Sequence, residues 1–417
     1  MPFMNAEELK KEAREWKDKI IQQRKYLHAH AETGFALDNT LAYVKAELEK
    51  MGCAPQLCGR AGLVAMVGGK KPGKVFLLRA DMDALPIQEQ AEVDFASTNG
   101  SMHACGHDMH TAMLLGAARL LKRHEEDICG TVKLMFQPAE EIFEGSADMI
   151  RAGLLENPPV EGALMIHVMA GVPFEPGTVI VSGPGVSAPA ADYFEIRVKG
   201  KGCHGSMPHM GIDPLTAAAH MIIALQEIHA RELAMTDRAV LTIGTMHGGT
   251  AANAIADVVT MGGSLRTFDE EVRAFIKERM AEIVHSVAKT FRAEAEISFG
   301  SGCPTLKNDR ELSHDAYRYV KELLGPKMAF SVEELNAGGG SGGASKSAGS
   351  EDFAYISQRV PSVMLALAAG QPEKGYCYPQ HHPMVKFDND ALDLGSAVYA
   401  YTAMRWLEDH AAYPALP

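Results

Sequence analysis

Four cysteine and histidine side chains lie within eight consecutive residues of this chain. The stretch is residues 103–110, with the sequence HACGHDMH. Cysteine and histidine are the ligands that zinc and similar transition metals prefer. Taken alone, Cys105 or His107 is more typical of a buried thiol or a helix-capping histidine. A nucleophilic Cys105 with His107 as its base is a further alternative. That alternative leaves the acidic pairs and the distant histidines without a role, so the cluster favours a metal site.

Two pairs of carboxylates each follow an apolar run: Asp81 and Asp83, and Glu140 and Glu141. If the backbone at Glu140 is still extended, adjacent side chains point to opposite sides. One acid can then bind metal while the other faces the substrate and a water. Two adjacent glutamates by themselves are more typical of a solvated loop. Asp81 and Asp83 are equally typical of a turn at the end of a strand.

Distant histidines complete the set of possible ligands. His167 lies in an apolar run at 164–168, and His381 and His382 precede Pro383. Alone, His167 is more typical of a hydrogen-bonded core histidine. Only a folded core can bring these side chains to the Cys/His cluster and the acidic pair. Such a set suits metal-assisted hydrolysis, in which the ion generates hydroxide at neutral pH and polarises a carbonyl.

The elements that position these residues alternate between strands and helices. Helices are predicted at 6–27, 39–51 and 108–124, and strands at 64–67, 75–78, 132–136 and 163–168. Apolar strands that alternate with helices predict a parallel or mixed sheet covered on both faces. Such sheets bind ligands at the carboxyl ends of their strands.

The pattern changes between residues 188 and 301. Strands at 193–198, 239–245, 258–267 and 296–299 and helices at 213–230 and 269–292 give the order β-α-β-β-α-β of a ferredoxin-like sandwich. We therefore predict a discontinuous α/β catalytic domain of residues 1–187 and 302–417, with an inserted α+β domain of residues 188–301. The catalytic domain is expected to end in a helix at 389–408. The length of the whole chain, 417 residues, also favours two domains.

The inserted domain carries polar residues suited to binding a carboxylate and an oxyanion. His204 follows a glycine turn, and Asn253 and Arg266 lie on or near predicted strands. Exposed polar residues without a function are equally common.

A glycine-rich stretch at 337–347 is similar to a phosphate-binding loop at first sight. Ser345 stands where that motif requires glycine before its lysine, and no strong strand precedes it, so a flexible loop is predicted. Ser350 then has the position of a helix N-cap.

Composition excludes several classes of protein. The net charge of −13 argues against nucleic acid as the main partner. No stretch reaches the roughly 18 apolar residues of a membrane span, and the N-terminal residues predict an amphipathic helix and no signal peptide. The seven cysteines are scattered and do not indicate a disulfide framework. The expected compartment is a reducing cytoplasm.

Six motifs together resemble the M20 metallopeptidase family, and specifically its amidohydrolase branch of hippurate hydrolases, N-acyl-L-amino acid amidohydrolases (aminoacylases) and auxin-conjugate hydrolases. They are RADMDALP at 79–86, HACGHD at 103–108, QPAEE at 137–141, HGSMPH at 204–209, SEDF at 350–353 and HHP at 381–383. The motifs occur in the right order over essentially the whole chain.

The resemblance implies a zinc-peptidase-like catalytic domain with an inserted lid and dimerisation domain, and a site for two divalent ions. A cysteine ligand suits Zn²⁺ or Co²⁺, although the family also uses Mn²⁺ and Ni²⁺. The implied metal ligands are Cys105, His107, Glu141, His167 and His381, where the His-x-Pro pattern selects His381 over His382.

Roles for the remaining residues also follow from the resemblance. Glu140 would be the general base that activates the attacking water and passes its proton to the leaving amine, and Asp83 would orient a ligand. His204, supplied across a homodimer, would support the oxyanion. Asn253 and Arg266 would help to hold the substrate carboxylate.

The predicted function is a metal-dependent amidohydrolase that cleaves N-acetyl, N-benzoyl or longer N-acyl amino acids. Alternatives are a carboxypeptidase or dipeptidase, including aminobenzoyl-glutamate-type cleavage, and a non-catalytic metal- or ligand-binding protein of the same fold. Glu140 favours an enzyme, because a binding protein needs no base beside the metal. Two departures from the family pattern are Ala31, where proline is usual, and a longer glycine-rich loop.

Overall fold

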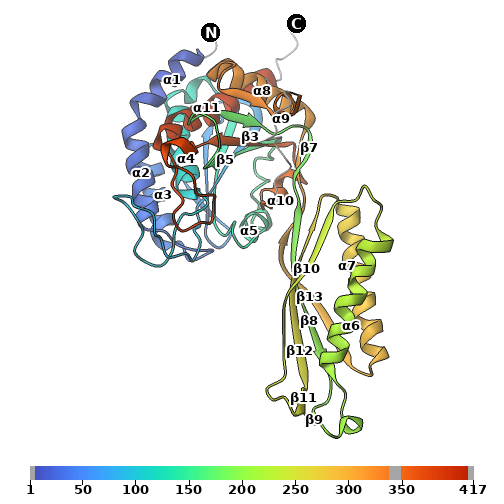
Figure 1. Ribbon diagram of the computed structural model, residues 1–417. Coiled ribbons are helices and arrows are strands. Elements are labelled where there is room, and N and C mark those ends of the chain that lie inside the picture. The colour runs from blue at the N-terminus through green and yellow to red at the C-terminus, as the bar shows by residue number, and fades with distance from the viewer. Residues whose placement is uncertain (1–4, 338–348, 412–417) are drawn as a thin grey trace. The chain divides into compact units, whose positions relative to one another are not determined.

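The computed structural model describes residues 5–337 and 349–411, which divide into two compact units (Figure 1). Of the described residues, 5–187, 307–337 and 355–411 form the larger unit, and 188–306 and 349–354 form the smaller unit. All residues of the predicted insert therefore lie in the smaller unit. Most of the glycine-rich stretch lies outside the described residues.

An eight-stranded mixed sheet forms the centre of the larger unit. Its order is β1 (Gln56–Cys58), β2 (Gly62–Gly68), β4 (Cys129–Gln137), β3 (Lys71–Asp81), β5 (Gly162–Met169), β16 (Ser362–Ala368), β6 (Val179–Val181) and β15 (Ala329–Ser331). The central strands β4, β3, β5 and β16 are parallel, while β2 joins β4, and β6 joins β16, in antiparallel pairing. The predicted mixed α/β sheet is confirmed. A short ladder of β7 (Gly185–Ala188) and β14 (Leu306–Asn308) lies outside it.

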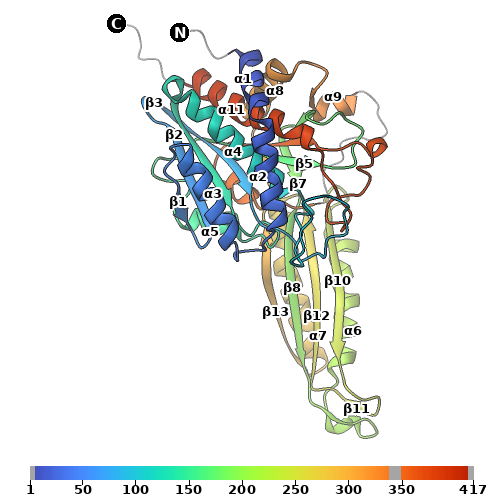
Figure 2. The same ribbon diagram turned by 90° about the vertical axis from the view of Figure 1, so that its left-hand side faces the viewer.

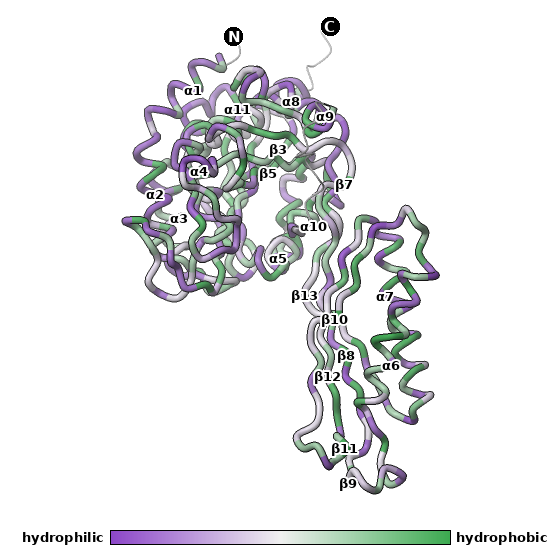
Figure 3. Tube along the Cα trace, in the orientation of Figure 1, coloured by the Kyte–Doolittle hydropathy of each residue, from purple (hydrophilic) through white to green (hydrophobic). Residues whose placement is uncertain are grey.

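Helices surround this sheet, some packed directly on its apolar strands and others on those helices. They are α1 (Ala6–Glu15), α2 (Lys17–Ala29), α3 (Asp38–Lys50), α4 (His107–Arg123), α5 (Gly145–Arg151), α8 (Arg310–Leu324), α9 (Val332–Ala337), α10 (Ala354–Ser357) and α11 (Leu392–Asp409). Helices α4 and α11 lie side by side against β3, with α2 on α4 (Figure 2). Strand β5 is largely hydrophobic, whereas α1 and α2 are mainly hydrophilic (Figure 3). Residues 75–81 of β3 are all buried, as expected of a strand covered on both faces.

Two predicted helix boundaries are wrong. The single helix predicted at 6–27 is broken at Trp16, which ends α1 and precedes α2. No helix begins at Ser350: α10 begins only at Ala354, and the Ser350 hydroxyl instead accepts a hydrogen bond from Arg266.

The smaller unit has the predicted β-α-β-β-α-β order. Its elements are β8 (Ala190–Lys199), α6 (Pro214–Glu227), β10 (Ala239–Gly248), β12 (Val258–Thr267), α7 (Glu270–Thr290) and β13 (Glu294–Cys303), with the short pair β9 (Cys203–His204) and β11 (Ala254–Ile255). The four long strands form an antiparallel sheet in the order β10-β12-β8-β13. Helices α6 and α7 pack together on this sheet and form a separate apolar core with it. In the described part of the whole chain, no helix is long and apolar enough to cross a membrane.

Candidate metal centre

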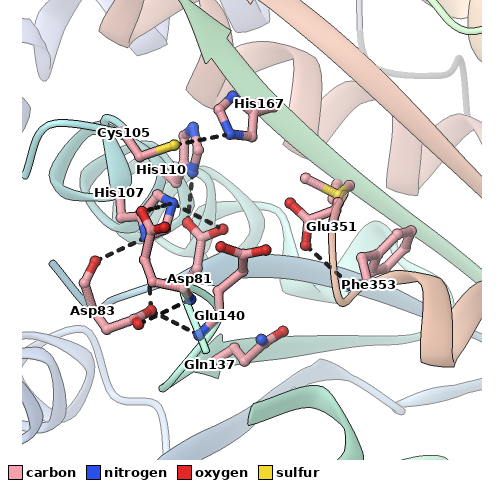
Figure 4. Close-up of polar contacts among 12 residues, drawn as sticks. Asp81, Asp83, Cys105, His107, His110, Gln137, Glu140, His167, Glu351 and Phe353 are labelled. Carbon is pink, nitrogen blue, oxygen red and sulfur yellow. Dashed lines mark hydrogen bonds and ion pairs between the residues drawn. The ribbon is translucent and has the colours of Figure 1, made fainter. Parts of the chain in front are cut away.

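The predicted metal-binding residues of the larger unit gather at the carboxyl ends of parallel strands. Asp81 ends β3 and Gln137 ends β4, so Asp83 and Glu140 follow directly, while His167 lies within β5. Cys105 and His107 lie where α4 begins (Figure 4). The carboxyl ends of parallel strands share one edge of a sheet, and this shared edge brings together residues that are distant in sequence.

A left-handed glycine shapes the turn that carries Cys105 and His107. Gly106 has a φ of 90°, and a Cβ atom there would lie 2.4 Å from a methyl carbon of Val168. Only glycine therefore fits this position without displacing β5. The His107 Nδ1 atom donates a hydrogen bond to the Asp83 carbonyl oxygen at 2.8 Å. The buried Nε2 atom has no hydrogen-bond partner, and it lies 3.8 Å from Glu141 Oε1. An unpartnered buried nitrogen that faces a carboxylate fits a metal ligand.

His167 is oriented in the same way. Its Nδ1 atom donates to the backbone carbonyl of Val168 at 2.7 Å, which places the lone pair on Nε2. The Nε2 atom lies 3.5 Å from the Cys105 sulfur (Figure 4). A backbone carbonyl thus selects the tautomer of both His107 and His167, and their Nε2 atoms face the other candidate ligands.

A tight turn carries Glu140 and Glu141. The backbone there is not extended, so the prediction that their side chains point to opposite sides of a strand does not apply. Ala139 has a φ of 54°, and the Phe143 amide bonds the Glu140 carbonyl at 2.7 Å. The Asp83 carboxylate accepts hydrogen bonds from the amides of Glu140 and Glu141, at 2.9 and 3.2 Å. Asp83 therefore holds the glutamate turn through its carboxylate and His107 through its carbonyl.

The structure distinguishes the two histidines of the doublet. The His381 Nε2 atom lies 3.6 Å from Glu141 Oε2. The His382 Nδ1 atom accepts the Met384 amide at 3.1 Å, and its ring stacks on Tyr378. His381 also has a positive φ of 66°, a conformation that is uncommon outside glycine and that concentrates at functional sites.

Three overlapping groups contain all the predicted ligands of the larger unit. Within each group, the possible ligand atoms lie within 4.8 Å of one another. The groups are Cys105, His107 and His167; Cys105, Glu141 and His381; and His107, Glu140 and Glu141. Thiolate, imidazole and carboxylate are together the donors of a transition-metal site.

Burial shifts the pKa of the Cys105 thiol and the pKa values of the imidazoles in opposite directions. It raises the pKa of the Cys105 thiol to about 12, and it lowers the pKa of His167 to about 3 and that of His381 below its usual value. For His107, burial also disfavours the charge, but the negative charge of Asp81 outweighs it and raises the pKa. A thiolate at Cys105 therefore needs a nearby cation, which a bound metal provides.

His110 supports the site and is not positioned as a ligand. Its Nε2 atom accepts the backbone amide of Val168 at 2.9 Å, so its Nδ1 atom carries the proton and donates to Asp81 at 2.6 Å. Asp81 also accepts a 2.6 Å bond from Arg79. The sequence contained a signal for this ion pair, because residues two apart on a strand share a face. His103 is fully buried and belongs to none of the three groups.

The candidate substrate-binding residues of the smaller unit do not lie together. His204 and Asn253 line one pocket beside Val258, at the start of β12. Arg266 lies eight residues further along the same strand, or about 26 Å at the rise of a β-strand. There it donates to Ser350 and to the Tyr193 hydroxyl. Within the smaller unit of one copy, Arg266 and His204 cannot contact the same small molecule.

Residues 77–405 match the model of peptidase family M20/M25/M40. An N-acetylcysteine deacetylase of Bacillus subtilis (strain 168) is 34% identical over 94% of this chain and 97% of its own length. An N-acyl-L-amino acid amidohydrolase of Geobacillus stearothermophilus is 39% identical over 72% of this chain and 80% of its own length.

Solved structures with a similar fold include a protein described as a member of the M20 family. A Bacillus subtilis protein described as a dinuclear metal binding peptidase from the M20 family superposes with a TM-score of 0.77, at 31% identity over 95% of this chain and 99% of its own. A Staphylococcus aureus structure reaches a TM-score of 0.86 at 31% identity, over 97% of this chain and 100% of its own.

Proposed function

The chain belongs to peptidase family M20/M25/M40 and is a metal-dependent hydrolase, and we propose that it cleaves the amide bond of N-acyl amino acids. The products would be a carboxylic acid and a free amino acid. The observation that carries the proposal is the three overlapping groups of possible ligands, which share Cys105, His107 and Glu141 and add His167, His381 and Glu140. The names of two relatives support an acylated amino acid as the substrate.

The donor set suits two divalent transition-metal ions, and we propose Zn²⁺, with Co²⁺, Mn²⁺ or Ni²⁺ as substitutes. The unpartnered Nε2 atom of buried His107 supports this assignment. Bound ions would polarise the scissile carbonyl and lower the pKa of water. Cys105 and Glu141 would balance the charge of the ions, while the carbonyl oxygens of Asp83 and Val168 hold the imidazoles in the ligating tautomer.

Glu140 would move the proton that hydrolysis requires. Its carboxylate would take a proton from the attacking water and deliver it to the nitrogen of the leaving amine. The amides of the glutamate turn donate to Asp83, which holds Glu140 beside His107 and Glu141. A pre-positioned acceptor of this kind is what general base catalysis needs.

A peptidase that releases amino acids from peptides is the second candidate function. The observation in its favour is a relative named thermostable carboxypeptidase 1, from Saccharolobus solfataricus (strain ATCC 35092 / DSM 1617 / JCM 11322 / P2), which is 34% identical over 96% of this chain. The metal centre would serve either substrate, because both reactions hydrolyse an amide.

A mass-spectrometric screen of the metal-reconstituted protein separates the two candidates. The panel contains N-acetyl, N-benzoyl and longer N-acyl amino acids together with dipeptides. We expect release of free amino acid from one N-acyl class. Cleavage of dipeptides alone would favour the peptidase, and no cleavage by metal-loaded protein would favour a binding protein.

We also propose a homodimer in which His204 acts on a substrate bound to the other copy. The separation of His204 and Asn253 from Arg266 along β12 supports this arrangement, because two copies could supply both ends to one substrate. His204→Ala should then lower kcat by about 10²–10³-fold, the usual cost of removing an oxyanion donor, with metal content unchanged. A loss of metal in this variant would make His204 a ligand and contradict the assignment.

Mixing two inactive variants tests the exchange directly. A heterodimer of Glu140→Gln and His204→Ala contains one site with both residues intact if His204 crosses to the other copy. Random mixing should restore about a quarter of the wild-type activity, since half of the dimers carry one active site of two. Activity that stays at the level of the separate variants would place both residues in one copy's site.

We further propose that the protein works in a reducing compartment such as the cytoplasm. All seven cysteines are unpaired, and Cys105 must remain reduced to bind metal.

A further inference from the structure

A buried cluster of charged side chains adjoins the turn that carries Cys105 and His107. Arg24 and His28, one turn apart on α2, both contact the Asp108 carboxylate: Arg24 Nε and His28 Nδ1 each lie 2.9 Å from the same oxygen. These three side chains are at most 4% exposed. Asp108 follows His107 in the first turn of α4, so the cluster holds the start of this helix.

His28 is held between two carboxylates. Its second ring nitrogen lies 3.0 Å from Glu89, whose other oxygen accepts the Ser97 amide at 2.7 Å. Burial alone would lower the pKa of His28, but the charge of Asp108 and the hydrogen bonds to both carboxylates raise it to about 9. Two cations thus balance two anions, and an interior charge cluster is stable only when it is paired in this way.

Arg24 extends the cluster to a second part of the site. Its Nη1 atom donates to the Phe387 carbonyl at 2.9 Å and to the Asn389 side chain at 2.5 Å. Phe387 lies in the segment that follows His381. The beginning of that segment is attached to the Cys105 turn, because the His381 amide bonds the Ala104 carbonyl at 2.9 Å. One guanidinium therefore connects the two segments that carry Cys105, His107 and His381.

We propose that Arg24 and His28 are positioning residues of the metal centre. By holding Asp108 and Phe387, they keep the ligands on the α4 turn at the spacing from His381 that a shared ion requires. The inference rests on the proposed metal site. Groups that orient the ligands of a metal typically contribute about 10–100-fold to its affinity.

Gln23 provides a matched control on the same helix. It is fully buried, and its amide donates to Glu47 on α3 at 2.7 Å. Within the described residues, no side-chain hydrogen bond or ion pair links Gln23 to a segment with a metal ligand. If Arg24 served only to stabilise the fold, Arg24→Met and Gln23→Met would both lower the Tm and leave metal affinity unchanged.

The experiment compares metal binding by the full chain and these two variants at a temperature below every Tm. Zn²⁺ affinity is measured by competition with a chelator, and the Co²⁺ absorption spectrum reports the ligand geometry. We expect Arg24→Met to lose about 10–100-fold in Zn²⁺ affinity and to change the Co²⁺ spectrum. Gln23→Met should match the wild type in both. Equal Zn²⁺ affinities for the two variants would overturn the proposal.

Milder variants keep the test decisive if Arg24→Met does not fold. Arg24→Lys keeps the charge but cannot reproduce the planar fork, and His28→Gln keeps a donor without the charge. Each should lose about tenfold in Zn²⁺ affinity, and wild-type affinity in both would overturn the inference. Failure of the wild type itself to bind Zn²⁺ or Co²⁺ would instead refute the metal centre on which the inference rests.

Discussion

Glu140→Gln is expected to lower kcat by about 10²–10⁴-fold and to leave metal content unchanged. Glutamine has nearly the same shape as glutamate but cannot accept a proton from water at neutral pH. The Glu140 backbone amide would still donate to Asp83, so the turn that presents Glu141 should keep its conformation. Activity is measured with the N-acyl amino acid identified by the screen, and metal content by elemental analysis.

Glu141→Gln is the matched control for this variant, because it makes the same chemical change one residue further along the turn. Glu141 faces His107 and His381, at 3.8 and 3.6 Å, so this variant should lose metal as well as activity. Wild-type turnover by Glu140→Gln would remove Glu140 as the base. Loss of metal from both variants would show that the two glutamates share the role of ligand.

Cys105→Ser is expected to weaken metal binding by at least about 100-fold, which is the upper range for groups that only orient ligands. A hydroxyl occupies nearly the same position, but it does not ionise in this pH range and is a poor ligand for zinc-like ions. Apo protein of both forms should have the same circular dichroism, since the site contributes little to either apolar core. Chelator competition with Zn²⁺ measures the affinity.

The pH dependence of metal binding separates the thiolate from the other ligands. Without metal, the Cys105 thiol has a pKa of about 12, so it is protonated throughout pH 6–8, and metal binding must release this proton. Each released proton makes the affinity rise about tenfold per pH unit. Cys105→Ser should therefore show a slope that is one proton smaller than the wild type. Equal slopes would mean that Cys105 does not bind as a thiolate.

The proposed role of Arg266 depends on whether the protein forms a dimer. The sequence predicted Arg266, Asn253 and His204 in one domain, and the family resemblance implied that Asn253 and Arg266 hold the substrate carboxylate while His204 supports the oxyanion. The structure separates Arg266 from the other two along β12, and pairs it with Ser350 and Tyr193. The mixing experiment with Glu140→Gln and His204→Ala decides whether His204 of one copy acts with Glu140 of the other.

Much of this protein was determined by its sequence alone. Apolar strands that alternate with helices predicted the mixed sheet, because strands buried on both faces are mostly apolar. The type and order of possible ligands indicated metal-assisted hydrolysis, since few other reactions need Cys105, His107 and an acidic pair together. The β-α-β-β-α-β order of the smaller unit likewise follows from hydrophobic periodicity.

Only the tertiary structure decided which atoms face one another. The sequence pattern alone could not show that His382 accepts the Met384 amide, or that both nitrogens of His110 are engaged by Asp81 and Val168. For His110, the outcome depends on contacts between segments far apart in the chain, because Asp81 lies on β3 and Val168 on β5. Local spacing determines which residues share an element, whereas packing determines which elements meet. The arrangement of the metal centre therefore comes from long-range contacts at the sheet edge.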